Sequence, residues 1–112
     1  MGYIDLYLLP VREDNVEEYR AQASAFGAVV KEKGALSYRE FRADDLRDGF
    51  AGSAGPGHLL TSAVVEFESR AHRDAVMEQV LADPRVGAMT DAEPIADMSQ
   101  MRYGGFETFV EA

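Results

Sequence analysis

Side chains alternate between two kinds along residues 3–9, which is the period of a β-strand. One kind is aliphatic and the other is aromatic or acidic: Ile4, Leu6 and Leu8 against Tyr3, Asp5 and Tyr7. Neither set is polar throughout, so we expect both faces of this strand to be covered, one of them by helices of the same chain. Asp5 is the exception, a carboxylate in the middle of an otherwise apolar strand.

The rest of the chain alternates between the periods of helices and of strands. Apolar residues recur every three or four positions from Val16 to Val30, which predicts a helix that Gly34 ends. A second helix is predicted from residue 70 to about 82, with Ser69 as its N-cap. Strands are predicted over three further segments by their period of two: residues 35–43, 59–68 and 98–110.

The predicted element order is β-α-β-β-α-β in a single domain spanning residues 1–112. This is the ferredoxin-like α+β arrangement, a four-stranded antiparallel sheet with two helices on one face. Its first and third strands lie at the centre, and the more polar second strand lies at an edge. The uncovered face would expose an apolar patch of the kind that marks an interface. We therefore expect a homodimer in which two sheets pack face to face, a dimeric α+β barrel.

The predicted last strand contains a glycine pair, Gly104-Gly105. Two glycines in a β-prone segment indicate either a β-bulge or a position where a neighbouring group comes close. Two other segments lack a regular period. Residues 44–58 are rich in Gly and Asp and are predicted to form an irregular loop. Asp83-Pro84-Arg85 should stop the second helix and open a short further turn, followed by a connecting loop over residues 90–97.

Charge and composition narrow the possible partners. The chain carries 11 basic and 20 acidic residues, a net charge of −9, and has no cysteine. Nucleic-acid phosphates would be repelled, and a disulfide framework or a thiol nucleophile is excluded. No segment has the length and hydropathy of a membrane span or a signal peptide. We expect a cytoplasmic protein that binds neither nucleic acid nor a membrane.

Asp5 is the first candidate for a functional residue, because a buried carboxylate is costly unless it is paired. Its candidate partners are basic or phenolic: Arg42, Arg102, Tyr38 and Tyr103. Asp5, Tyr38, Arg42 and Tyr103 together would form a ligand site. Asp5, Glu40 and Glu66 are the candidates for acid/base catalysis. The alternative is that Asp5 belongs to a structural polar pair and that both glutamates are solvated.

The sequence does not indicate a metal or cofactor site. His58 and His72 are the only histidines, and they are not spaced as a pair of ligands on one helix. Asp44, Asp45 and Asp48 lie in the irregular loop, where acidic residues are usually solvated. We expect no bound metal and no cofactor.

Several short motifs together resemble the YbaA-like family, a bacterial family of unknown function, over nearly the whole chain. The matching segments are Gly34-Ala35-Leu36, Glu40, the loop at 45–49, Arg73-Asp74, Asp83-Pro84-Arg85, Met101 and Tyr103-Gly104-Gly105-Phe106-Glu107. The resemblance implies a ferredoxin-like fold of the dimeric α+β barrel type, with no established activity. The chain departs from the family pattern in lacking Trp and in having Arg42 and Val64 at positions where aromatic residues are expected.

Two functional hypotheses follow. In the first, a homodimer binds a small organic molecule in the cavity between its two sheets and acts as a cofactor-free acid/base enzyme. In the second, the protein is a non-catalytic binding or assembly module with a packed dimer core. The polarity and size of the cavity separate the two hypotheses.

Overall fold

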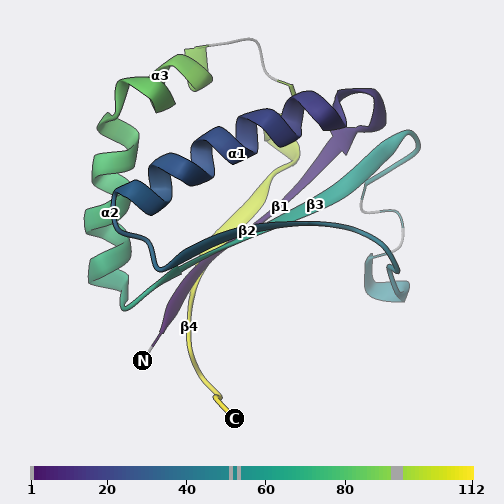
Figure 1. Ribbon diagram of the computed structural model, residues 1–112. Helices are drawn as coiled ribbons and strands as arrows, with labels where there is room; N and C mark the ends of the chain where they lie inside the picture. Colours follow the sequence, from purple (N-terminus) through teal and green to yellow (C-terminus); the bar gives the residue numbers. More distant parts are fainter. Residues whose placement is uncertain (1, 51, 53, 92–94) are drawn as a thin grey trace.

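The computed structural model describes residues 2–50, 52, 54–91 and 95–112. The main elements are β1 (Tyr3–Arg12), α1 (Val16–Glu32), β2 (Ser37–Arg42), β3 (His58–Phe67), α2 (Arg70–Ala82), α3 (Pro84–Asp91) and β4 (Arg102–Glu107). Short 3-10 helices cover Glu13–Asn15, Asp48–Phe50 and Met98–Gln100. The four strands form one antiparallel sheet in the order β2-β3-β1-β4, with the helices on one side of it (Figure 1). The predicted ferredoxin-like α+β fold is confirmed.

The helix boundaries follow from local sequence. The Ser69 hydroxyl accepts a hydrogen bond from the backbone N–H of His72 at 3.1 Å, so α2 begins where its N-cap was predicted. Gly34 has a φ of +118°, a conformation that favours glycine, and α1 ends just before it. The turn predicted after Asp83 is longer than expected, because α3 continues from Pro84 to Asp91. The expected connecting loop at 90–97 therefore begins later, and positions 92–94 lie outside the described residues.

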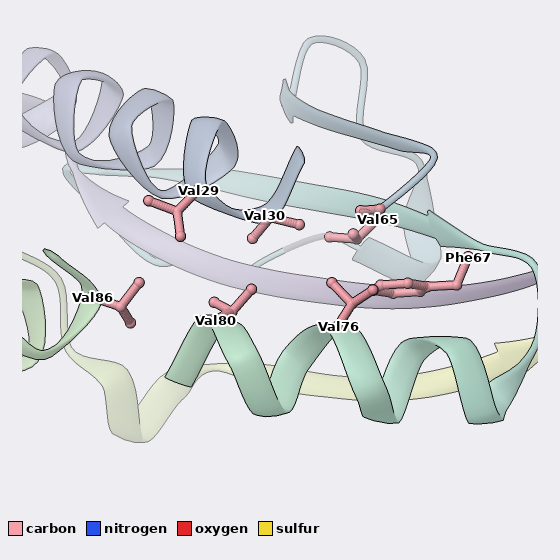
Figure 2. Packing of buried hydrophobic residues seen from close by; sticks show 8 residues of the cluster. Val29, Val30, Val65, Phe67, Val76, Val80 and Val86 are labelled. Carbon is pink, nitrogen blue, oxygen red and sulfur yellow. The ribbon is translucent and has the colours of Figure 1, made fainter. Parts of the chain in front are cut away.

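The hydrophobic core lies between the sheet and the helices. Figure 2 shows side chains from four elements meeting there: Val29 and Val30 of α1, Val65 and Phe67 of β3, Val76 and Val80 of α2, and Val86 of α3. Phe67, Val30 and Val80 are fully buried. Side chains alternate between the two faces of a strand. The β3 side chains that lie in the core therefore show which side chains of β3, and of the strands beside it, face the helices.

We call the covered side the helix face. It carries Tyr3, Asp5 and Tyr7 of β1, whose partners on β3 are Phe67, Val65 and Ala63. We call the other side the open face. It carries Ile4, Leu6 and Leu8 of β1, Val64 of β3, Phe41 of β2 and Phe106 of β4. The alternation of β1 was predicted correctly, and the structure shows which of its two faces is covered.

Strand β4 is shorter than predicted and contains no bulge, because its residues pair one to one with β1 from Leu8↔Arg102 to Tyr3↔Glu107. The second explanation for the glycine pair applies to Gly105. A Cβ at this position would lie 2.6 Å from Cζ of Tyr3 and would overlap its hydroxyl. Gly104 faces the other way, and its nearest neighbour would be Phe106 Cε1 at 3.9 Å. One glycine is therefore required by Tyr3, and the other is not crowded.

Candidate functional site

The larger cavity of the described chain lies on the helix face, between the sheet, α1, α2, α3 and the segment that leads into β4. Its volume is about 480 Å³, and most of its lining is apolar. Phe26 of α1 contributes an aromatic wall, and four methionines surround the space: Met77, Met89, Met98 and Met101. A mainly apolar cavity of this size with a few polar groups is typical of small-molecule sites. We had expected the ligand cavity between two sheets, on the opposite face.

Glu40 is the acidic residue in the wall of this cavity. Its carboxylate accepts a hydrogen bond from the Tyr19 hydroxyl at 2.7 Å and another from the Tyr38 hydroxyl at 2.5 Å. Alternation along β2 places Tyr38 and Glu40 on the helix face, opposite Val65 and Ala63. Tyr19 belongs to the apolar stripe of α1, which faces the same space. The two phenols hold the carboxylate between a helix and an edge strand.

The phenols beside Glu40 remain proton donors over the ordinary pH range. Burial raises the pKa of Tyr38, and the hydrogen bond to the Glu40 carboxylate raises it further. The pKa of Tyr19 is raised by the same two causes in the same order. Tyr7 also lines the cavity, and burial, together with the nearby Asp5 carboxylate, raises its pKa to about 12.

Asp5 lies under α2 and not between two sheets. It is 5% exposed, and Arg73 Nη1 donates a hydrogen bond to its Oδ1 at 2.5 Å. Arg73 also lies 5.1 Å over the ring of Tyr3, and its Nε contacts Asp74 at 2.8 Å. Burial raises the pKa of Asp5, and the Arg73 charge offsets this only in part. The pair has the geometry of a structural ion pair between sheet and helix.

The partners that the sequence suggested for Asp5 are therefore wrong. Arg102 is opposite Leu8 and faces the open side, and Arg42 is opposite Thr61, several residues along the sheet. Tyr38 is hydrogen-bonded to Glu40 instead. The pairing between Asp5 and Arg73 spans 68 positions, and no local pattern indicates it.

The other candidate residues lie in different places. Arg42 lines a smaller cavity of about 320 Å³, which shares the Glu40 wall with the larger one. Tyr103 is 70% exposed and stacks on Tyr7 with 5.7 Å between the ring centroids. Glu66 is on the open face, where Ser37 donates a hydrogen bond to it at 2.6 Å. The structure thus brings together Tyr38 and Glu40, and it separates Asp5 and Glu66 from them.

Sequence reasoning missed Tyr7, Tyr19 and the methionines as parts of the site. Tyr19 was interpreted only as a member of the apolar stripe of α1, because its spacing is that of core residues. Its hydroxyl is the one distinguishing signal, since a buried phenol needs a hydrogen-bond partner. Among the described residues, every buried polar side-chain atom has such a partner.

The histidines do not gather at the cavity. His58 contacts the Pro56 carbonyl at 2.9 Å, and His72 accepts a hydrogen bond from the Glu68 backbone N–H at 3.0 Å through Nδ1. Within the described ranges, no three His, Cys, Asp or Glu residues are arranged to hold a metal ion. No helix in the same ranges is long and apolar enough to cross a lipid bilayer.

Comparison with known proteins agrees with the fold. Residues 2–97 match the family described as Protein of unknown function (DUF1428). The uncharacterized protein YbaA of Escherichia coli K12 is 31% identical over 117 aligned residues, which cover 99% of both chains. This chain belongs to the DUF1428 family. The family resemblance inferred from the sequence is therefore confirmed, and YbaA of Shigella flexneri shows the same 31% identity.

Solved structures share the fold at low sequence identity. Rv0793 from Mycobacterium tuberculosis superposes with a TM-score of 0.62 at 13% identity, covering 100% of this chain and 99% of the other. SnoaB from Streptomyces nogalater, a cofactor-independent oxygenase studied as its N63A mutant, gives 0.64 at 11% identity, covering 98% and 95%. At such identities the likeness concerns the fold alone.

Proposed function

We propose that this DUF1428 protein is a homodimer that binds a small organic molecule in the cavity between sheet and helices, and that Glu40 acts there as proton acceptor. The observation that carries the proposal is the carboxylate held by Tyr19 and Tyr38 in the wall of an otherwise apolar cavity of about 480 Å³. A carboxylate offers about four acceptor sites, and the phenols occupy two of them. The remaining sites are available to a ligand.

The arrangement suits acid/base chemistry without a cofactor. A general base must lie within hydrogen-bonding reach of the proton it removes and must be held in a fixed orientation. The hydrogen bonds from Tyr19 and Tyr38 hold both oxygens of Glu40. The mainly apolar lining lowers the local polarity, which strengthens any polar contact with a bound molecule. A cofactor-independent oxygenase with the same fold supports this choice of chemistry by analogy only.

The open face supports the homodimer. It is lined by apolar side chains, of which Phe41 is 45% exposed and Phe106 is 53% exposed. Beyond the end of β4, Phe109 and Val110 are 95% and 79% exposed. Contiguous apolar surface of this kind usually marks an interface. A second copy that brings the same face would cover both patches at once.

Filling the cavity tests the binding function. Ala23 lines the cavity from α1, whereas Ala28 is exposed on the same helix, so Ala23→Phe and Ala28→Phe form a matched pair. We expect native mass spectrometry of protein purified from cell extract to show a retained small molecule with the wild type and with Ala28→Phe. Ala23→Phe should not retain it. A wild-type protein without any bound molecule would instead favour the assembly module.

A second measurement separates binding from chemistry. If Glu40 removes a proton, the retained molecule should exchange one of its carbon-bound hydrogens with D2O when the wild-type protein is present. At ligand concentrations that saturate the variant, Glu40→Gln should abolish this exchange, because an amide does not accept the proton. Equal exchange with the wild type and with Glu40→Gln would overturn the role of Glu40 as base.

A further inference from the structure

The charge of the larger cavity is unbalanced. Among the described residues that line it, Glu40 is the only acidic or basic side chain. None of the ion pairs found in the described part of the chain includes Glu40. Its hydrogen-bond donors, Tyr19 and Tyr38, are neutral phenols. A carboxylate in such surroundings has a strong requirement for a positive partner, because apolar surroundings do not solvate it.

The basic residues near Glu40 line the smaller cavity. Arg20 and Arg42 line the smaller space of about 320 Å³ and not the larger one. Both side chains belong to exposed residues, and Arg20 already contacts Glu17 at 3.3 Å. Among the described residues, the lining of the larger cavity therefore supplies no counter-charge to the Glu40 carboxylate.

The rings around Glu40 add a second preference for positive charge. Four aromatic side chains line the cavity: Tyr7, Tyr19, Phe26 and Tyr38. Phe26 and Tyr38 lie edge to face with 6.0 Å between their centroids, so their surfaces are turned in different directions. Aromatic faces attract ammonium groups, and cages of several rings recognise methylated ammonium in particular. The net charge of −9 also favours the approach of cations over anions.

We infer that the molecule bound in this cavity is an organic monocation, an amine or quaternary ammonium group attached to an apolar body. Its charged end contacts Glu40 and the surrounding tyrosines. Its apolar body lies among the methionines, whose flexible side chains adapt to varied shapes. The inference depends on the proposed function, since it names the class of ligand for the same cavity.

Three probes of similar size and different charge test the inference. Benzyltrimethylammonium is the cation, neopentylbenzene replaces its nitrogen with carbon, and 3-phenylpropionate supplies an anion. Each is titrated into the labelled protein, and binding is followed by the NMR signals of the residues that line the cavity. We expect the cation to bind at least about tenfold more tightly than the neutral probe, and the anion not to bind.

Two charge-removing variants locate the preference. Glu40→Gln should remove most of the difference in affinity between the cation and the neutral probe, leaving the part that the aromatic rings supply. The affinity for the neutral probe should stay unchanged. Glu66→Gln is the matched control, because it removes the same charge from a half-buried strand position on the open face. It should leave the cation preference intact. An equal loss in both variants would overturn the inference, since the preference would then come from net charge.

The outcomes separate the inference from the proposed function. If the neutral probe or the anion binds as tightly as the cation, the cavity binds small molecules but the ligand class is wrong. If none of the three probes binds, the proposed binding function fails with it. If Glu40→Gln does not fold, the affinities of the wild-type protein for the three probes still test the inference, because that measurement requires no variant.

Discussion

Both faces of the sheet carry apolar as well as polar side chains, but only the helix face is covered. The helix face, which is covered, carries Asp5, Glu40 and Thr61, all of them hydrogen-bonded. The open face carries aliphatic and aromatic side chains such as Leu6 and Phe106. A soluble domain normally covers its apolar face and leaves the polar one in water. The polar groups under the helices are the basis of the proposed site, and the uncovered apolar groups are the basis of the proposed homodimer.

The faces also differ in how their polar groups are satisfied. On the helix face, Thr61 Oγ1 donates to the Leu9 carbonyl at 2.8 Å, and Arg73 reaches Asp5 from α2. On the open face, Arg39 lies 3.8 Å from Glu66 with both side chains in contact with solvent. Such an exposed pair contributes little to stability. Changes on the two faces should therefore affect different properties, folding on one and assembly on the other.

The largest effect is expected from a charge on the open face. Leu6→Glu should raise the dissociation constant of the dimer at least about 1,000-fold, since each copy would bury a carboxylate, at a cost above ~4 kcal/mol. Sedimentation across a concentration series measures this. Leu46→Glu is the matched control, because Leu46 is 43% exposed in the loop after β2. A wild-type protein that sediments as a single chain would contradict the proposed dimer.

Gly104 and Gly105 are adjacent in β4 but lie on opposite faces of the sheet, so substituting each of them compares the two faces. Gly105→Val should lower the free energy of unfolding by about 3 kcal/mol, because the new side chain overlaps Tyr3, on which Arg73 rests. Gly104→Val faces the open side and should change it by less than about 1 kcal/mol. Urea unfolding of both variants measures the difference. Equal losses would show that crowding by Tyr3 is not the reason for glycine at position 105.

The smallest effect concerns pH and two buried aspartates. Burial raises the pKa of Asp5 above 3.8, so its folded-state contribution is present below 3.8 and is lost as pH rises through the folded value. Hydrogen bonds from Arg85 lower the pKa of Asp83, so its contribution is present above 3.8 and is lost as pH falls through the folded value. The two residues should therefore respond to acid in opposite directions.

Urea unfolding at about pH 7, about pH 4 and about pH 2.5 checks these directions. Relative to Asp5→Asn, the wild type should gain stability as pH falls, because burial raises the pKa of Asp5 in the folded state. Relative to Asp83→Asn, its advantage should shrink on further acidification. A wild type that loses stability in acid relative to Asp5→Asn would show that the Arg73 charge outweighs burial. Asp5→Asn should also leave the dimer intact, because Asp5 is on the helix face.

The element order could be predicted because each element carries its own period in the sequence. The assignment of faces could not, since both faces of β1 are largely apolar or aromatic and alternation alone does not say which of them meets a helix. That choice depends on pairs far apart in sequence, such as Asp5 with Arg73. The glycine pair could be narrowed only to two alternatives, because only the position of Tyr3 in space distinguishes a close approach at Gly105 from a β-bulge.

The candidate site could be predicted only in part. Glu40 and Tyr38 were named as candidates because their residue types suit acid/base chemistry and ligand binding, but they were assigned to different groups. Their association depends on an alternation within β2, which a short polar strand indicates only weakly. Tyr19 joins them from α1, at a separation of 21 residues from Glu40. Burial of its hydroxyl appears only when helix and sheet are packed together.

Gly105 and Tyr3 have a consequence for how the sequence varies among relatives. Positions 3 and 105 share one volume, so a large residue at one requires the absence of a side chain at the other. The two positions should covary, with glycine at 105 wherever tyrosine stands at 3. The residue at position 104 does not contact Tyr3, so it should not covary with position 3. It should instead covary with the residues that cover the open face of β4.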